Sequence, residues 1–232
     1  MADIKGLEKF APKDFPGHIA STVFVAGCNF RCPFCQNPDL IVRPETLASI
    51  PMDFFLAYLD GRKGWLEGVC VSGGEPLLDP GLEELLSVIK ERDLLVKLDT
   101  NGSFPDRLEQ LIEGELVDYV AMDVKAPLER YVEVTRAKVD PAAIERSVRL
   151  IRTAGVTYVF RTTVVPGLVA EEDIAKISRW LDGAAVFQIQ QFSPRNTLDP
   201  DFAKLKPFDP AEIRRMADVA KDYFLDVRVE GI

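Results

Sequence analysis

The chain has few of the side chains that usually make a self-contained metal site, and no segment typical of membrane insertion. Its 232 residues include four cysteines and one histidine. No apolar run is long enough to span a membrane, and the first residues lack the apolar segment of a secretory signal. A net charge of −9 argues against the basic face that nucleic-acid binding needs. We expect no membrane or nucleic-acid partner.

The bulk composition is that of a globular protein. Hydrophobic residues make up 47% of the chain and charged residues 28%. The sequence contains no low-complexity segment, heptad array or short repeat. Its length suits a single domain, so we expect one domain over residues 1–232. Clustered thiols fit a reducing compartment better than a disulfide framework, which predicts a cytoplasmic location.

Three of the four cysteines lie within eight residues. Cys28, Cys32 and Cys35 form a C-x3-C-x2-C pattern in GCNFRCPFC. A closed structural zinc site takes four protein ligands, and neither remaining candidate fits, because Cys70 lies in a strand-like apolar run and His18 leads into another strand. Three thiolates on a [4Fe–4S] cluster leave one iron open to a substrate or cofactor. The pattern favours such a cluster over zinc or another single metal ion.

Hydrophobic periodicity predicts alternating strands and helices. The expected strands cover residues 19–27, 67–73, 94–100, 117–124, 156–165 and 185–192, with a short terminal strand possible over 226–232. The expected helices cover residues 52–60, 79–93, 107–113, 140–155, 171–183 and 209–223. Repeated strand–helix units give right-handed crossovers and a parallel sheet. We predict an α/β fold, an open partial (β/α)6 TIM-like barrel, with a flat doubly wound sheet as the alternative.

Helix ends carry recognisable capping residues. Asp79 followed by Pro80 predicts the start of the second helix, and Asp209 with Glu212 predicts a capping box at the last one. The helix over 140–155 starts on Asp-Pro and stops at Gly155.

Polar and glycine-rich clusters follow the predicted strands. They are the cysteine loop, SGGEP (72–76), LDTNG (98–102), MDVKAP (122–127), TTVVPG (162–167) and QQFSPRN (190–196). In a barrel, all of these clusters lie at the carboxyl-terminal face of the strands, which is where barrel enzymes carry their active sites. The sequence therefore predicts an active site at this face.

These motifs resemble those of the radical S-adenosylmethionine (SAM) superfamily. Its signature is the C-x3-C-x2-C loop with an aromatic residue, here Phe34, before the last cysteine, and GGEP resembles its SAM-amine motif. DTNG and the D-x-K of MDVK are more specific to glycyl-radical-enzyme activating proteins such as pyruvate formate-lyase activating enzyme. The resemblance is greatest to the anaerobic ribonucleoside-triphosphate reductase activating proteins. One departure is Gln36, where many relatives carry histidine.

The resemblance implies a mechanism carried by cofactors. Cys28, Cys32 and Cys35 would ligate three irons of a [4Fe–4S] cluster, and SAM would chelate the fourth. Reductive cleavage of SAM would then give methionine and a 5′-deoxyadenosyl radical that abstracts hydrogen from a C–H bond. The protein would position these groups. We expect the cluster and SAM to carry the chemistry, with no catalytic side chain in addition to them.

The resemblance also assigns binding roles. The loop of Gly73, Gly74, Glu75 and Pro76 would meet the SAM ammonium group, with glycines allowing close backbone approach. Asp99, Thr100 and Asp123 would bind a monovalent cation beside the SAM carboxylate. The remaining expected cofactor contacts are Phe34, Asn101, Lys125, Arg161 and Gln190. Strand alternation places Gln188 and Gln190 on one face and Gln191 on the other, without indicating which face is inward.

The leading prediction is therefore an activase that generates a glycyl radical on a partner enzyme. The expected partner is an anaerobic ribonucleotide reductase, and next a pyruvate formate-lyase-like enzyme, with a flavodoxin or ferredoxin as electron donor. An alternative is a radical SAM enzyme acting on a small nucleotide precursor, similar to 7-carboxy-7-deazaguanine synthase. A remote alternative is an iron–sulfur protein that only transfers electrons.

Overall fold

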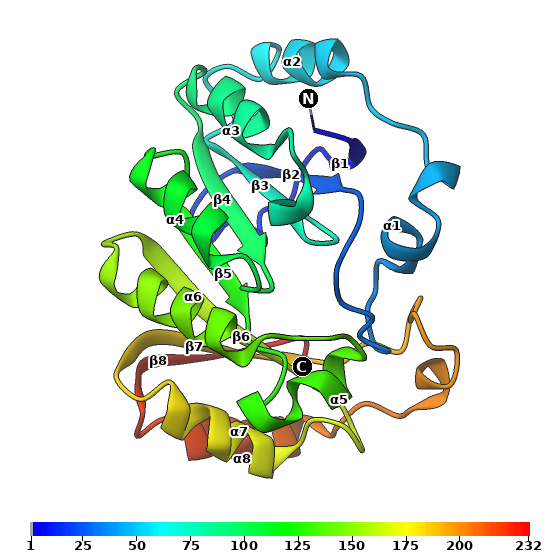
Figure 1. The fold of residues 1–232 in the computed structure, drawn as a ribbon, viewed down its shortest axis with the longest axis vertical. Helices are drawn as coiled ribbons and strands as arrows, with labels where there is room; N and C mark the ends of the chain where they lie inside the picture. The colour runs from blue at the N-terminus through cyan, green and yellow to red at the C-terminus, as the bar shows by residue number, and fades with distance from the viewer. Residues whose placement is uncertain (1) are drawn as a thin grey trace.

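A curved sheet of eight strands forms the centre of the molecule (Figure 1). The computed structural model describes residues 2–232. The strands follow one another across the sheet in chain order, so β1 and β8 are its end strands. The strands are β1 (Ile4–Glu8), β2 (Ala20–Val25), β3 (Gly68–Gly73), β4 (Leu95–Thr100), β5 (Tyr119–Asp123), β6 (Thr157–Val164), β7 (Ala184–Gln191) and β8 (Phe224–Glu230).

The predicted open barrel of parallel strands is confirmed, although the sheet has more strands than expected and one of them is antiparallel. Strands β2 to β8 pair in parallel, whereas β1 pairs antiparallel with β2. The possible terminal strand is β8, a full member of the sheet that pairs with β7. Strand β1 was not predicted, because five residues with a central glycine, IKGLE, give no clear alternation.

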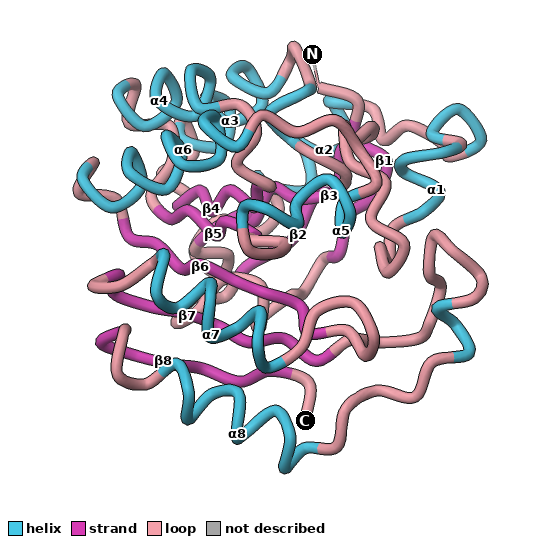
Figure 2. Tube along the Cα trace, turned by 60° about the horizontal axis from the view of Figure 1, so that its bottom comes forward, coloured by secondary structure: helices cyan, strands magenta, loops and turns pink. Residues whose placement is uncertain are grey.

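Helices cover the outer face of the sheet and bury its apolar side chains against their own (Figure 2). None of the helices in residues 2–232 is long and apolar enough to cross a membrane. The helices are α1 (Pro38–Val42), α2 (Met52–Asp60), α3 (Leu82–Lys90), α4 (Pro105–Glu113), α5 (Tyr131–Thr135), α6 (Pro141–Thr153), α7 (Glu171–Trp180) and α8 (Pro210–Ala220).

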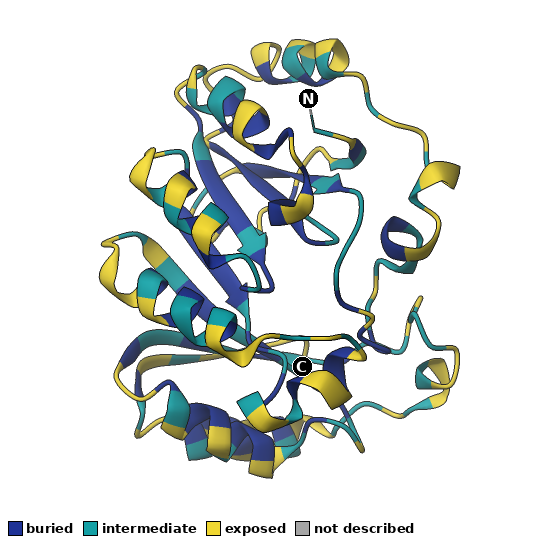
Figure 3. Ribbon diagram, in the orientation of Figure 1, coloured by how far each residue is buried: buried dark blue, intermediate teal, exposed yellow. Residues whose placement is uncertain are grey.

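Burial is greatest along the strands and on the inner faces of the helices (Figure 3). A second, smaller cluster groups Phe15 with Ala20, Tyr119, Ala121 and Val159. Ala20 and Tyr119 begin β2 and β5, so this cluster lies at the amino-terminal end of the strands. The amino-terminal end of the barrel is therefore filled by packed apolar side chains.

The predicted N-terminal caps are confirmed for two helices, and the third is wrong. The Asp140 carboxylate accepts the Ala142 N–H, and Asp209 forms the capping box with Glu212. The helix predicted over 79–93 instead begins at Leu82, after a 3-10 turn over Pro76–Leu78. Asp79 does not cap α3 at the predicted position, because its carboxylate accepts the N–H groups of Asp3 and Gly81.

Candidate active site

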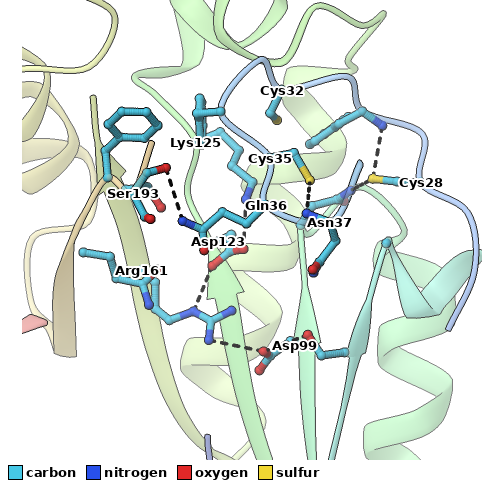
Figure 4. A pocket seen from close by; sticks show the side chains of 18 of the residues that line it. Cys28, Cys32, Cys35, Gln36, Asn37, Asp99, Asp123, Lys125, Arg161 and Ser193 are labelled. Atoms are coloured by element: carbon cyan, nitrogen blue, oxygen red, sulfur yellow. Dashed lines mark hydrogen bonds and ion pairs between the residues drawn. The ribbon is translucent and has the colours of Figure 1, made fainter. Parts of the chain in front are cut away.

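A pocket of about 370 Å³ opens at the carboxyl-terminal ends of the strands (Figure 4). All three clustered cysteines line it, whereas Cys70 and His18 lie outside the lining. Glu75 and Pro76 are also outside it. The other predicted site residues that line the pocket are Phe34, Gly73, Gly74, Asp99, Thr100, Asn101, Asp123, Lys125, Arg161 and Gln190.

The cysteine loop, residues 28–37, connects β2 to α1 and carries free thiols. Cys32 is 6% exposed, and Cys28 and Cys35 are partly exposed. Burial raises the pKa of Cys28 to about 11 and that of Cys32 to about 12. The Cys28 and Cys35 sulfurs accept N–H groups two residues further along, each at 3.4 Å. Such contacts favour the thiolate form that metal binding requires.

The donor set of the pocket fits a group that takes three thiolates. The three cysteine side chains lie around the upper part of the cavity in Figure 4, with Lys125 beside them and Asp123 below them. Within residues 2–232, no three His, Cys, Asp or Glu side chains are gathered so that they could hold one metal ion. Three thiols that line one cavity are the protein donor set that a [4Fe–4S] cluster takes when one of its irons is left open.

The two glycines at the end of β3, Gly73 and Gly74, have a packing role that the sequence did not indicate. A Cβ on Gly73 would lie 2.3 Å from the Val25 carbonyl oxygen, and one on Gly74 would lie 1.8 Å from that of Gly27. The expected reason was close approach to a ligand. The structure adds a nearer cause, because the β3 loop packs backbone to backbone against the start of the cysteine loop.

Glu75 supports the site from beneath. Its side chain is fully buried, and its carboxylate accepts the N–H groups of Leu77 and Asn101 and the Thr100 hydroxyl. Burial raises the pKa of Glu75 to about 7, in opposition to these hydrogen bonds, which lower it. Glu75 thereby ties the loop after β3 to the end of β4, and in this arrangement its oxygens do not face the pocket.

The floor of the pocket is a chain of alternating charges. The Asp123 carboxylate accepts Lys125 Nζ at 2.9 Å and Arg161 Nε at 2.8 Å. Arg161 also contacts Asp99 at 3.3 Å, and Lys97 forms an ion pair with the same carboxylate. Burial raises the pKa of Asp123, but Arg161 and Lys125 outweigh it and hold that pKa well below its usual range. Both carboxylates therefore stay ionised at neutral pH.

Lys97 does not line the pocket but pairs with Asp99, which does, and sequence reasoning missed it. It is 2% exposed, in the middle of β4, and its amine also lies 3.5 Å from the Cys70 sulfur. A lysine inside an apolar strand is costly unless it is paired, and the same signal did identify Arg161 in β6. Applied to LLVKLDT, that signal could have indicated Lys97.

The wall opposite the cysteines comes from β6, β7 and β8. Gln188 and Gln190 both donate to the Glu230 carboxylate, which places these two amides on one face. The Gln191 amide instead donates to the Phe208 carbonyl at 2.7 Å. Both Gln190 and Gln191 line the pocket and Gln188 does not, so alternation along the strand does not separate the two lining amides. Thr163 and Glu230 are further lining residues that the sequence did not indicate.

Comparison with known proteins defines the family. The Radical SAM superfamily matches residues 22–181. The chain is 32% identical to "Putative glycyl-radical enzyme activating enzyme MJ1227" of Methanocaldococcus jannaschii, over 99% of this chain and 96% of that protein. It is 27% identical to a pyruvate formate-lyase-activating enzyme of Clostridium pasteurianum, over 85% of this chain and 84% of that protein. A 7-carboxy-7-deazaguanine synthase of Methanopyrus kandleri is 36% identical, over 49% of this chain and 52% of that protein.

Solved structures share the fold at low identity. Streptococcus suis SuiB matches with a TM-score of 0.68 and 17% identity, over 89% of this chain, which spans 47% of SuiB. Fold and motifs together define a radical SAM enzyme. More narrowly, the chain belongs to the glycyl-radical-enzyme activating enzymes of the radical SAM superfamily. That superfamily implies a [4Fe–4S] cluster and SAM as cofactors.

Proposed function

We propose that the chain, as a single domain over residues 1–232, generates a glycyl radical on a partner enzyme. The observation that carries the proposal is the meeting of three thiols and a charged floor in one pocket. The bound cluster and SAM would supply a carbon-centred radical by one-electron cleavage of SAM. The residues of the chain would bind these groups, orient them and keep water away from them.

Each residue set would have its own task. Cys28, Cys32 and Cys35 would hold the cluster. Although burial alone lowers the pKa of Lys125, the Asp123 carboxylate and the nearby cysteine thiols raise it well above its ordinary value. The Lys125 amine is therefore a permanent cation suited to the SAM carboxylate. Backbone groups of Gly73 and Gly74 would meet the SAM ammonium, and Phe34, Asn101, Arg161 and Gln190 would complete the SAM site.

The monovalent cation predicted at Asp99, Thr100 and Asp123 has weaker support. Arg161 contacts both carboxylates, and the Thr100 hydroxyl donates to Glu75. These donors do not fit a cation while the protein's own cations occupy them. The cation stays a prediction that requires Arg161 or Lys125 to move.

The proposed partner is a glycyl radical enzyme, first an anaerobic ribonucleotide reductase and next a pyruvate formate-lyase-like enzyme. The similarity to a pyruvate formate-lyase-activating enzyme supports testing the second of these. A flavodoxin or ferredoxin would supply the electron. The cytoplasmic location likewise stays a prediction.

The decisive experiment is anaerobic. The cluster is reconstituted and reduced, SAM is added, and 5′-deoxyadenosine is measured with and without each candidate partner, while electron paramagnetic resonance monitors the glycyl radical. We expect 5′-deoxyadenosine together with a glycyl doublet that requires one partner. A fully loaded cluster that leaves SAM intact would refute the proposed chemistry.

The same assay tests the second candidate, a small-molecule substrate such as a nucleotide precursor. The partial similarity to the Methanopyrus kandleri enzyme favours including it. SAM cleavage stimulated by a nucleotide precursor, with no glycyl radical on any partner, would replace the activase proposal with this one.

A further inference from the structure

The connection between β7 and α8, residues 192–209, reaches across to the cysteine loop. Figure 1 shows the two segments, orange and blue, meeting on the side away from β3 and β4. Asp199 N–H donates to the Pro33 carbonyl at 2.9 Å, and Leu198 N–H donates to the Cys35 carbonyl at 3.0 Å. The backbone between the second and third cysteines is therefore held by a segment more than 160 residues away in the chain.

Two side-chain contacts extend this junction. Gln36 Nε2 donates to the Ser193 carbonyl at 3.4 Å, as drawn in Figure 4, and Asn196 Nδ2 donates to the Gln36 carbonyl at 3.1 Å. Four hydrogen bonds thus join the connection to residues 33–36 of the cysteine loop.

A second support holds the same loop from the end of α5. Arg31 N–H donates to the Thr135 carbonyl at 2.8 Å. The next residue, Arg136, has a φ of 48°. A left-handed conformation is uncommon for arginine, and such outliers persist where surrounding contacts enforce them.

One ion pair joins the two supports. The Arg136 guanidinium donates to the Asp199 carboxylate at 2.7 Å and lies 5.7 Å from the centre of the Phe202 ring. The cysteine loop, the end of α5 and the β7–α8 connection therefore form a closed triangle of contacts, and the Arg136–Asp199 pair is its third side.

We propose that Arg136 and Asp199 are positioning residues that hold the cysteine loop in its ligand geometry. Neither residue lines the pocket, so each acts through the loop backbone. The pair is partly exposed, with side-chain exposures of 51% and 22%. Exposed pairs stabilise a fold only modestly, so their loss affects local opening of the loop more than global unfolding. The proposal rests on the proposed cluster function, and its test separates the two.

The test uses the full chain and two measurements. The first is the rate at which reconstituted protein releases iron to a chelator without oxygen. The second is alkylation of the iron-free chain, read by peptide mass spectrometry as the ratio of labelled Cys32 to labelled Cys70. Cys32 reports opening of the cysteine loop, whereas Cys70, fully buried in β3, reports global unfolding.

The variants are Asp199→Asn and Arg136→Met. Asparagine retains an oxygen that can accept the Asp201 N–H, which Asp199 accepts at 3.0 Å. In each variant we expect iron release and the Cys32 to Cys70 labelling ratio to rise about two- to fivefold, the range that exposed ion pairs support. The double variant should exceed neither single variant, because both remove one interaction. Arg136→Lys should restore most of the wild-type behaviour.

The matched control is Asp106→Asn, which breaks the surface pair of Asp106 with Arg146 on α4 and α6. It should leave both measurements unchanged. Wild-type rates in both test variants would overturn the inference, as would Cys70 labelling that rises in step with Cys32. A wild-type chain that takes up no iron would refute the cluster function, and the labelling ratio would still decide whether the pair positions the loop.

Discussion

Gly74 lies against Gly27 so closely that a methyl group on Gly74 would come within 1.8 Å of the Gly27 carbonyl oxygen. The Glu75 N–H donates to that same oxygen at 2.7 Å. Since Gly27 directly precedes the first cysteine, this contact fixes where the cysteine loop begins.

Replacing Gly74 with alanine should therefore displace the cysteine loop. We expect the free energy of unfolding to fall by about 3 kcal/mol, since backbone atoms cannot yield as a side chain can. Iron bound after reconstitution should fall with it. Chemical denaturation and iron analysis measure both effects. Gly114→Ala, whose Cβ would lie 3.2 Å from its nearest neighbour, should bind iron normally. Normal iron content in Gly74→Ala would contradict the prediction.

The four cysteines should divide into three ligands and one packing residue. Cys32→Ala should abolish the iron–sulfur absorbance and SAM cleavage, because two thiolates cannot replace three. Cys70→Ala should retain both and cost about 1 kcal/mol of stability through lost packing. Iron and sulfide analysis of each reconstituted variant decides the matter. Loss of the cluster in Cys70→Ala would contradict the prediction, because it would show that cluster binding depends on the buried Cys70 thiol.

Lys125 should contribute to SAM affinity and not to cluster binding. Lys125→Met leaves Asp123 paired with Arg161, so the floor stays charge-compensated. We expect SAM affinity of the loaded protein to weaken about ten- to a hundredfold, since a hydrogen bond to a charged group contributes about 1.5–3 kcal/mol. Calorimetric titration measures it. Lys90→Met removes the ion pair with Asp118 outside the pocket and should leave the affinity unchanged. Equal affinities in all three proteins would exclude Lys125 from the SAM site.

Glu75 should make stability depend on pH. Burial raises its pKa in the folded chain to about 7, whereas the unfolded carboxyl titrates near the ordinary value of 4.5. Between these values the folded chain holds a proton that the unfolded chain has lost. Rising pH therefore favours unfolding, by up to about 1.4 kcal/mol per pH unit. Above pH 7 this contribution levels off.

Urea unfolding at pH 5.5 and pH 7.5 measures this contribution. Glu75→Gln should show a smaller fall in stability between the two conditions than wild type does, because glutamine does not titrate. Glu83→Gln, an exposed change at the start of α3, should retain the wild-type fall. Identical falls in wild type and Glu75→Gln would show that Glu75 is ionised throughout this range.

Local sequence pattern predicted the parts of the site that follow directly from strand ends. Cys28, Asp99 and Asp123 each come at or just after a strand, and parallel pairing brings such positions to one edge. Position at a strand end does not predict contacts between loops that are far apart in the chain. Arg136 and Asp199 are 63 residues apart, and neither lies in a periodic segment that would indicate its partner.

Side-chain direction was the other limit. The pattern SGGEP indicated a loop near the ligand, but not that Glu75 turns away from the pocket to accept three hydrogen bonds from its neighbours. A carboxylate beside a glycine pair suits a ligand or a backbone equally well. Only the position of the Asn101 N–H and the Thr100 hydroxyl decides between them.

Since β1 and β8 end the sheet, the ring around the pocket is completed by a loop junction and not by a strand ladder. A continuous ladder resists opening cooperatively, because every residue along it is paired with both neighbours. The junction of residues 33–36 with residues 193–199 consists of four separable hydrogen bonds. The ring can therefore widen at this junction while the strands keep their register. An enzyme needs this mechanical property if its substrate is part of another folded protein.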